Sequence, residues 1–209
     1  ITAWELLFER LQITQGNTDL GQSLLIVGAA GGVGSILVQL ARQLTGLTVI
    51  GTASRPETQA WVRQLGAHHV IDHRQPLSEE LKRIGIDQVT HVASLTQTDQ
   101  HFAQLVEALA PQGRLALIDD PEQALDIMQL KRKSLSLHWE LMFTRSLFET
   151  ADMIEQHRLL DRVAELVDAG TLHTTLGEHF GSINAANLRR AHALLESGTA
   201  KGKIVLEGF

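Results

Sequence analysis

The sequence contains no cysteine and no tyrosine among its 209 residues. Without cysteine, the chain forms neither a disulfide framework nor a thiolate zinc site. Its apolar runs are far shorter than the ~20 residues of a membrane-spanning helix, and we expect no leader peptide at its start. Acidic residues (24) outnumber basic ones (18), which leaves no basic surface for a nucleic-acid backbone. We therefore expect a cytoplasmic globular protein with no nucleic-acid or membrane partner.

Short apolar runs alternate with amphipathic segments over the first two thirds of the chain. Strands are expected at 23–27, 47–53, 68–73, 89–94, 114–119 and 134–139, and helices at 33–44, 56–66, 77–85 and 99–113, with a short helical stretch from Glu122. Strands that alternate with helices at this spacing are typical of a parallel sheet with right-handed crossovers. The pattern predicts an α/β fold, a Rossmann-type doubly wound parallel sheet of six strands.

Three parts of the chain differ in pattern, and they predict the domain organisation. Residues 1–17 form an amphipathic connecting helix that ends at Gly16 and Asn17, and residues 18–140 form the dinucleotide-binding domain. In the C-terminal extension, 141–209, we expect a long helix from about 147 to 169, a strand near 172–180, a helix over 185–196 and a final strand over 203–206. These last elements are too few to build a core of their own.

A glycine-rich turn joins the first strand to the next helix. Residues 29–34, AAGGVG, fit the pattern A-x-G-x-x-G. A turn of this kind presents free backbone N–H groups and the positive end of the helix dipole, which suit a pyrophosphate. Gly31 would let the backbone approach the phosphates, and Gly34 would let the helix pack closely on the strand. The motif and its place in the series predict a dinucleotide site.

Two other glycine-rich motifs do not match. A kinase-type phosphate loop needs a lysine before its Ser or Thr, but Gly34 is followed directly by Ser35. The spacing from Gly28 also fits short-chain dehydrogenases, whose chemistry needs a tyrosine acting with a lysine. Because the chain contains no tyrosine, a self-contained enzyme of that class is excluded.

The tip of the second strand carries the signal for cofactor choice. A carboxylate there would bind a ribose 2'-hydroxyl and favour NAD, but the sequence GTASRPET has Ser54 and Arg55 and no acid at this point. A guanidinium beside a hydroxyl suits a dianionic 2'-phosphate, so we predict NADP(H). Alternatively, Ser54 caps the following helix together with Glu57, while Arg55 is only solvated. Both interpretations can hold at once.

Four segments resemble one family of dehydrogenases. AAGGVGSILVQLARQL, TASRPET, LGAHHVIDH and the closing GKIVLEGF are similar to the medium-chain dehydrogenase/reductase superfamily, in its quinone oxidoreductase-like branch of zinc-type alcohol dehydrogenases. The resemblance covers the whole chain. It implies that this sequence corresponds to the nucleotide-binding domain and the C-terminal return to a catalytic domain, and that the N-terminal catalytic domain is absent.

The resemblance also implies roles for individual residues. The pyrophosphate would contact Ala30, Gly31, Gly32, Val33 and Gly34, the 2'-phosphate Ser54 and Arg55, the adenine Asp72 and His73, and the nicotinamide side Ser94, Leu95, Thr96, Ile118, Asp119 and Asp120. The last group also lies where strands of a parallel sheet end, and ligands bind there on general grounds. Met142–Arg145 and Lys203 are weaker candidates. The strand at 135–138 would be a sheet edge that pairs with a second copy to form a homodimer.

From these residues we expect an NADPH-dependent oxidoreductase, of which this chain is a part that is inactive alone. It would transfer hydride between NADP(H) and a small-molecule carbonyl, enone or quinone. The alternative is a non-catalytic dinucleotide-binding module, a sensor or a truncated product. No zinc is expected in this chain, because the resemblance implies that the residues that would bind zinc lie in the absent domain.

Ten histidines raise the question of a metal site. The tightest group is His68, His69 and His73 with Asp72, but neighbouring residues of a strand point to opposite faces, and we expect no metal there. His91, inside the fourth strand, is expected to be a hydrogen-bonded core residue. Because Asp119 and Asp120 can cap a helix as readily as serve chemistry, no catalytic acid or base is assigned.

Overall fold

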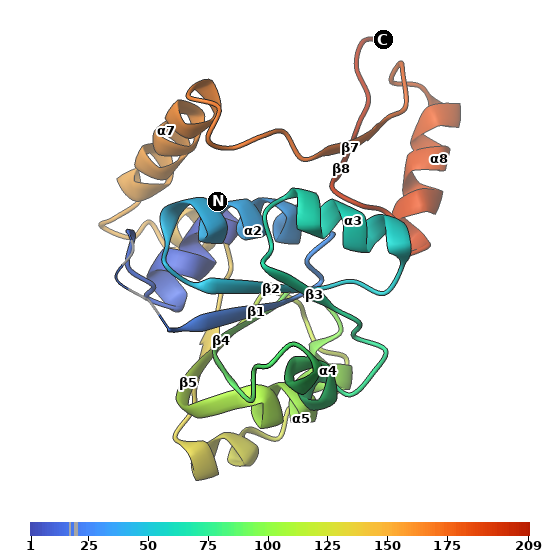
Figure 1. Ribbon diagram of the computed structural model, residues 1–209. Coiled ribbons are helices and arrows are strands. Elements are labelled where there is room, and N and C mark those ends of the chain that lie inside the picture. Colours follow the sequence, from blue (N-terminus) through green and yellow to red (C-terminus); the bar gives the residue numbers. More distant parts are fainter. Residues whose placement is uncertain (17, 19–20) are drawn as a thin grey trace.

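The computed structural model describes residues 1–16, 18 and 21–209, and at its centre lies a six-stranded sheet (Figure 1). All neighbouring strands pair in parallel, in the order β3-β2-β1-β4-β5-β6. This is the strand order of a complete Rossmann sheet, so the predicted fold class is confirmed. The strands are β1 Ser23–Val27, β2 Thr48–Thr52, β3 His69–Ile71, β4 Val89–Ser94, β5 Leu109–Leu117 and β6 Ser136–Trp139.

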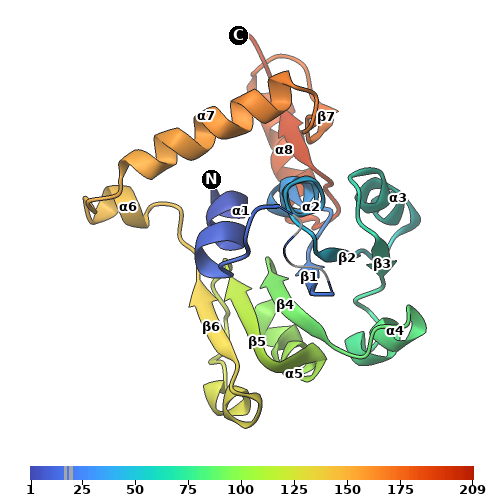
Figure 2. The same cartoon turned by 60° about the vertical axis from the view of Figure 1, so that its left-hand side comes forward.

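Helices cover both faces of the sheet (Figures 1 and 2). The helices are α1 Thr2–Trp4, continued by the π-helical turn η1 Glu5–Arg10, then α2 Gly32–Leu44, α3 Pro56–Gln64, α4 Leu77–Arg83, α5 Thr98–Ala108 and the 3-10 helix η2 Ile127–Lys133. On one face the core joins α1, η1, α2 and α3 to the sheet, and on the other it joins α4, α5 and η2. Strand β1 is buried along its whole length, as its unbroken apolar run requires between two helical layers.

The helix expected at 99–113 is shorter in the structure, and the strand after it is longer. Helix α5 ends at Ala108 and β5 begins at Leu109. Pro111 has no N–H to donate and disfavours helical geometry in the residue before it. The Lys133 ammonium group donates hydrogen bonds to carbonyl groups at the end of α5, including those of Val106 at 3.0 Å and Glu107 at 2.8 Å. The extension of the helix to residue 113 was therefore wrong.

The C-terminal extension crosses back over the α2 side of the sheet (Figure 2). It comprises α6 Thr144–Leu147, α7 Ile154–Asp168, β7 Leu176–His179, α8 Ala185–Glu196 and β8 Lys203–Val205, with β7 and β8 paired in parallel. The continuous helix expected from 147 to 169 was wrong. Glu149 has a φ of +46°, which a helix does not accept, and residues 148–153 separate α6 from α7.

Two further observations bear on the expected domain organisation. The expected end of the connecting helix, at Gly16 and Asn17, falls partly outside the described residues; η1 ends at Arg10. Within the part of the chain that the structure describes, no helix is long and apolar enough to cross a membrane.

Candidate functional site

In the turn between β1 and α2, few side chains cover the backbone. Gly28 has a φ of +80°, and Gly31 is the N-cap of α2 with no side chain capping the helix. A Cβ on Gly34 would lie 2.6 Å from the Cα of Ala29, so the close helix packing expected of Gly34 is present. A Cβ on Gly31 would meet only the Gly28 carbonyl at 3.4 Å. The structure therefore leaves room in front of free N–H groups at a helix N-terminus, the arrangement that binds phosphates.

A cleft of about 410 Å³ runs along the carboxyl ends of the strands, with this turn at its centre. Most of the predicted site residues line it: Ala30, Gly31, Gly32, Val33, Gly34, Ser54, Arg55, His73, Leu95, Thr96 and Ile118. They follow five different strands. Because the strand order is known, the cleft extends from the ends of β2 and β3, past the glycine turn, to the ends of β4 and β5.

Four predicted residues do not line the cleft: Asp72, Ser94, Asp119 and Asp120. Asp120 is exposed, and each of the other three has a partner elsewhere. Asp72 pairs with Arg74 at 2.7 Å, and hydrogen bonds from Arg74 lower the pKa of its carboxyl group. Ser94 is buried and shares a 2.8 Å hydrogen bond with the Thr98 hydroxyl. Asp119 accepts hydrogen bonds from the backbone N–H of Thr98, at 2.9 Å, and from its hydroxyl. It thereby caps the first turn of α5, the structural role left open for it.

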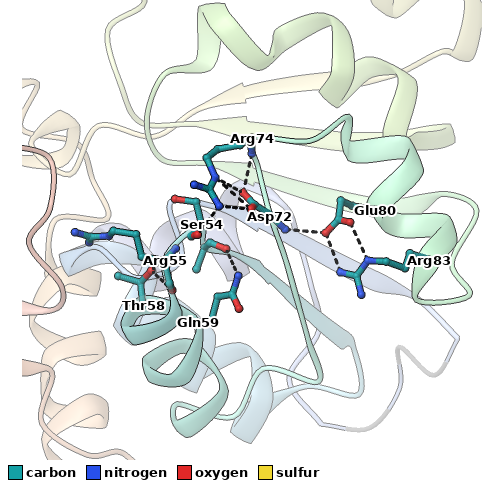
Figure 3. A network of polar contacts seen from close by, with 9 residues as sticks. Ser54, Arg55, Thr58, Gln59, Asp72, Arg74, Glu80 and Arg83 are labelled. Atoms are coloured by element: carbon teal, nitrogen blue, oxygen red, sulfur yellow. Dashed lines mark hydrogen bonds and ion pairs between the residues drawn. The ribbon is translucent and has the colours of Figure 1, made fainter.

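The two residues predicted to read the 2'-phosphate lie side by side at the tip of β2 (Figure 3). The N-cap of α3 is Arg55, not Ser54, so the proposed capping by Ser54 was wrong. The Ser54 carbonyl accepts a 2.8 Å hydrogen bond from Arg74, which reaches across from the end of β3. Arg55 pairs with Glu57 at 3.2 Å and donates to the carbonyl of Thr199 at 2.6 Å. Arg55 is thus held in place and is not merely solvated.

Some cleft residues were not predicted from the sequence. They are Val27, Gly28, Thr52, Ala53, Thr58, Gln97, His101, Gly198 and Ala200. His101 lies in the first turn of α5, and its ring centre is 6.2 Å from that of His73. Burial lowers the pKa of both imidazoles, which keeps them neutral at pH 7. The position of His101 after a strand end was an available signal, whereas nothing local marks Gly198 or Ala200.

The C-terminal extension meets the glycine turn directly. The N–H of Gly202 donates to the Ala30 carbonyl at 2.8 Å. Lys203 lies over the start of α2, since a Cβ on Gly32 would be 2.7 Å from its Nζ atom. Of the other weak candidates, Arg145 lies outside the cleft and is buried in ion pairs with Glu5 and Asp152.

The histidines do not form a metal site in the described part of the chain. No three side chains of His, Asp or Glu gather there as metal ligands would. His68 Nδ1 accepts a 2.9 Å hydrogen bond from the Val49 N–H. His91 is buried in β4, with Nδ1 2.9 Å from the Thr90 hydroxyl, and burial lowers its pKa to about 4. The prediction that His91 is a hydrogen-bonded core residue is confirmed.

Comparison with known proteins gives this cleft a context. A family model described as zinc-binding dehydrogenase matches residues 65–206. The chain belongs to the zinc-binding dehydrogenase family. Within that family, a zinc-type alcohol dehydrogenase-like protein of Staphylococcus aureus strain MRSA252 is 36% identical over 207 residues, which are 99% of this chain and 62% of the relative. The predicted relation to the zinc-type alcohol dehydrogenases is thus confirmed.

Solved structures of similar proteins show the same fold. A protein from Rhizobium etli CFN 42 described as a zinc-dependent alcohol dehydrogenase is 59% identical, with a TM-score of 0.93 over 100% of this chain and 60% of that chain. A mycobacterial protein in complex with NADPH is 25% identical, with a TM-score of 0.80 over 99% of this chain and 61% of that one. This chain therefore spans about 60% of the length of these relatives.

The family name raises the question of zinc. The chain has no cysteine, and residues 1–16, 18 and 21–209 contain no cluster of three His, Asp or Glu side chains suited to a metal. These residues do not fit a zinc ion.

Proposed function

We propose that the cleft binds NADP(H), and that the protein is the dinucleotide-binding part of an oxidoreductase. The observation that carries this proposal is the cleft itself, which crosses the carboxyl ends of five strands with an uncapped helix N-terminus at its centre. In open α/β sheets, dinucleotides lie at this switch point. A related mycobacterial protein binds NADPH, which supports the same assignment here.

The preference for NADP(H) over NAD(H) rests on the end of the cleft formed by β2 and β3. No carboxylate lines this end among the described residues, and Asp72 is engaged by Arg74. Arg55 lines the cleft, and Arg74 contacts the neighbouring Ser54 carbonyl. Two guanidinium groups near one hydroxyl suit a phosphate better than a ribose hydroxyl. The adenosine half would lie here, beside His73.

The nicotinamide half would then lie over the ends of β4 and β5, near Leu95, Thr96 and Ile118. Bound NADP(H) supplies hydride transfer at its nicotinamide ring. Among the described residues, the ionisable side chains that line the cleft are Arg55, His73 and His101. None of the three lies in the loop after β5, where the nicotinamide would bind. The chain's own residues would bind and orient the cofactor, and the substrate would be a small carbonyl, enone or quinone.

The wider setting is also proposed from these features. Residues 18–140 would be the dinucleotide-binding domain, residues 1–17 would connect it to a catalytic domain, and residues 141–209 would return to that domain. Apolar side chains beyond β6, such as Phe143, Phe148 and Leu195, are exposed. Their exposure supports the proposal that a catalytic domain covers them. We propose a cytoplasmic homodimer.

Titration with NADPH and NADH, followed by nicotinamide fluorescence, tests the cofactor assignment. We expect NADPH to bind more tightly, and Arg55→Glu to weaken NADPH binding by at least ~10-fold, because a charged phosphate contact becomes repulsive. NADH binding should change little. If the wild-type protein binds NADH as well as NADPH, and Arg55→Glu leaves the ratio of the two affinities unchanged, the NADP(H) assignment is wrong.

A further inference from the structure

Residues 198–200, which join α8 to β8, form a loop that contacts the cleft beside Arg55. Gly198 and Ala200 line the cleft on the same side as Arg55. The Thr199 carbonyl accepts a 2.6 Å hydrogen bond from Nη2 of Arg55. Two segments far apart in the chain therefore meet at the place where the 2'-phosphate would bind.

The loop is anchored on both sides. Helix α8 ends at the C-cap Ser197, whose hydroxyl lies 2.6 Å from that of Thr199. Gly198 takes the left-handed conformation after the helix, with a φ of +65°, and its N–H donates to the Leu195 carbonyl at 3.1 Å. Beyond the loop, Gly202 bonds to the glycine turn through Ala30. The Thr199 carbonyl is thus a fixed acceptor.

A fixed acceptor matters because Arg55 has a second partner. Glu57, 3.2 Å from Arg55 Nε, lies two residues along the chain in the first turn of α3. Glu57 alone would hold the guanidinium close to its own helix. The Thr199 carbonyl binds Nη2, at the other end of the guanidinium group, and holds it towards the C-terminal extension. A guanidinium has five N–H donors in a rigid fork, so these two contacts leave donors for a phosphate.

We propose that loop 198–200 is a positioning element for Arg55 and sets the protein's selectivity for a 2'-phosphorylated cofactor. This inference rests on the proposed binding of NADP(H). The loop's carbonyl holds the guanidinium in the orientation that a 2'-phosphate uses, so less side-chain freedom is lost on binding. The preference for NADP(H) is then shared between the nucleotide-binding sheet and the C-terminal extension.

Gly198→Val tests this role. A β-branched residue rarely takes a φ of +65°, and since a Cβ at Gly198 has no neighbour within 4 Å, the change acts on the loop's backbone path. We expect NADPH affinity to fall about 10-fold, as for the loss of one charge-assisted contact, and NADH affinity to stay within about twofold. Gly198→Asn should restore NADPH binding, because asparagine tolerates this conformation.

Gly170→Val is the matched control. Gly170 follows the C-cap of α7 with a φ of +69° and equally open surroundings, and it does not line the cleft. We expect it to leave both affinities unchanged. In an Arg55→Ala background, Gly198→Val should have no further effect on NADPH, since the two residues act through one contact.

The outcomes separate the inference from the cofactor assignment. If the wild-type protein binds NADPH no better than NADH, the NADP(H) assignment fails, and this inference fails with it. If Arg55→Ala abolishes the preference but Gly198→Val keeps it, the positioning role alone is wrong. A parallel loss of NADPH and NADH affinity in Gly198→Val would also overturn it, because the loop would then be only structural.

Discussion

At the residue scale, the surroundings of Glu140 strongly change the pKa of its carboxyl group. Glu140 follows β6, and its side chain is fully buried. One carboxylate oxygen accepts a 2.8 Å hydrogen bond from Arg10, while Oε1 has no partner among the described residues. Burial, together with the neighbouring Glu5, raises its pKa to about 7. Near neutral pH this carboxyl group is therefore partly protonated.

Such a shift makes stability depend on pH. The pKa of Glu140 is raised from 4.5 to about 7 in the folded state, so the folded protein binds more protons than the unfolded chain between these values. Its contribution to stability is complete below pH 4.5 and is lost as the pH rises through 7. Several histidines with lowered pKa values have the opposite effect at acid pH. The difference between a variant and the wild type isolates Glu140.

Glu140→Gln mimics the protonated carboxyl group at every pH. We expect its free energy of unfolding, relative to wild type, to rise between pH 5 and about pH 7 and then to level off. Urea unfolding between pH 5 and pH 8 measures this difference. Glu9→Gln is the control, because Glu9 is about half exposed, at 46% of its side chain, and lies 3.9 Å from Arg145. A pH-independent difference for Glu140→Gln would show that Glu140 is ionised throughout the folded range.

At the scale of elements, the start of α5 depends on a distant residue. Its N-cap Gln97 offers no capping side chain, and Asp119, in the loop after β5, supplies the missing acceptor to the Thr98 N–H at 2.9 Å. A carboxylate at a helix N-terminus satisfies a free donor and complements the helix dipole. This contact joins the loops after β4 and β5, both of which border the cleft.

Asp119→Ala should destabilise the protein by about 1–2 kcal/mol, the usual effect of losing a cap with a charged acceptor. Urea unfolding measures this, and Asp120→Ala, at an exposed neighbour, should have an effect below ~0.5 kcal/mol. We expect the NADPH dissociation constant of Asp119→Ala to change little. A large loss of NADPH affinity at unchanged stability would instead place Asp119 in the cofactor site.

The ends of the helices and strands show how well local sequence patterns predict secondary structure. The bounds of β4 and α8 agree with the sequence patterns, and β6 lies within its predicted run. The patterns failed at two element ends where tertiary contacts also act, although Pro111 was a local signal for the end of α5. Lys133 donates hydrogen bonds to the last carbonyl groups of α5. Arg145, in α6 before the break that precedes α7, forms a buried ion pair with Glu5. Neither contact has a signal in local periodicity.

At the scale of the whole molecule, β6 presents an exposed edge of the sheet. This strand is one of the two outer strands of the sheet, and in the described chain it pairs only with β5. The Glu140 N–H donates a hydrogen bond to the Leu117 carbonyl of β5. In a strand, the N–H groups of every second residue point to the same side. The N–H groups of Leu137 and Trp139 therefore face outwards, and Trp139 is 51% exposed. An exposed edge of this kind favours pairing with a second copy.

Trp139→Pro removes one outward N–H while keeping the strand position. If two copies pair through β6, sedimentation should show a dimer for the wild type and for Trp139→Ala, and a monomer for Trp139→Pro, because proline cannot donate a ladder hydrogen bond. Trp139→Ala controls for loss of the indole. A wild-type monomer at micromolar concentration, or a dimer in all three proteins, would contradict edge pairing through β6.

The sequence by itself determined the class of fold, the place of the glycine turn and most of the residues that line the cleft. The fold and the turn follow from apolar periodicity and glycine spacing, which each segment carries locally. The cleft residues follow from the glycine motif, from the rule that ligands bind where parallel strands end, and from the resemblance to a family of dehydrogenases. Only the tertiary structure decided that Asp119 caps α5, that Arg74 engages Asp72, and that Arg55 meets the Thr199 carbonyl 144 residues away. The contacts of Asp119 and Arg55 join segments that are distant in the sequence, and the contact of Arg55 forms only once the extension has packed against the sheet. The pair of Asp72 with Arg74 is local, but no apolar periodicity marks it.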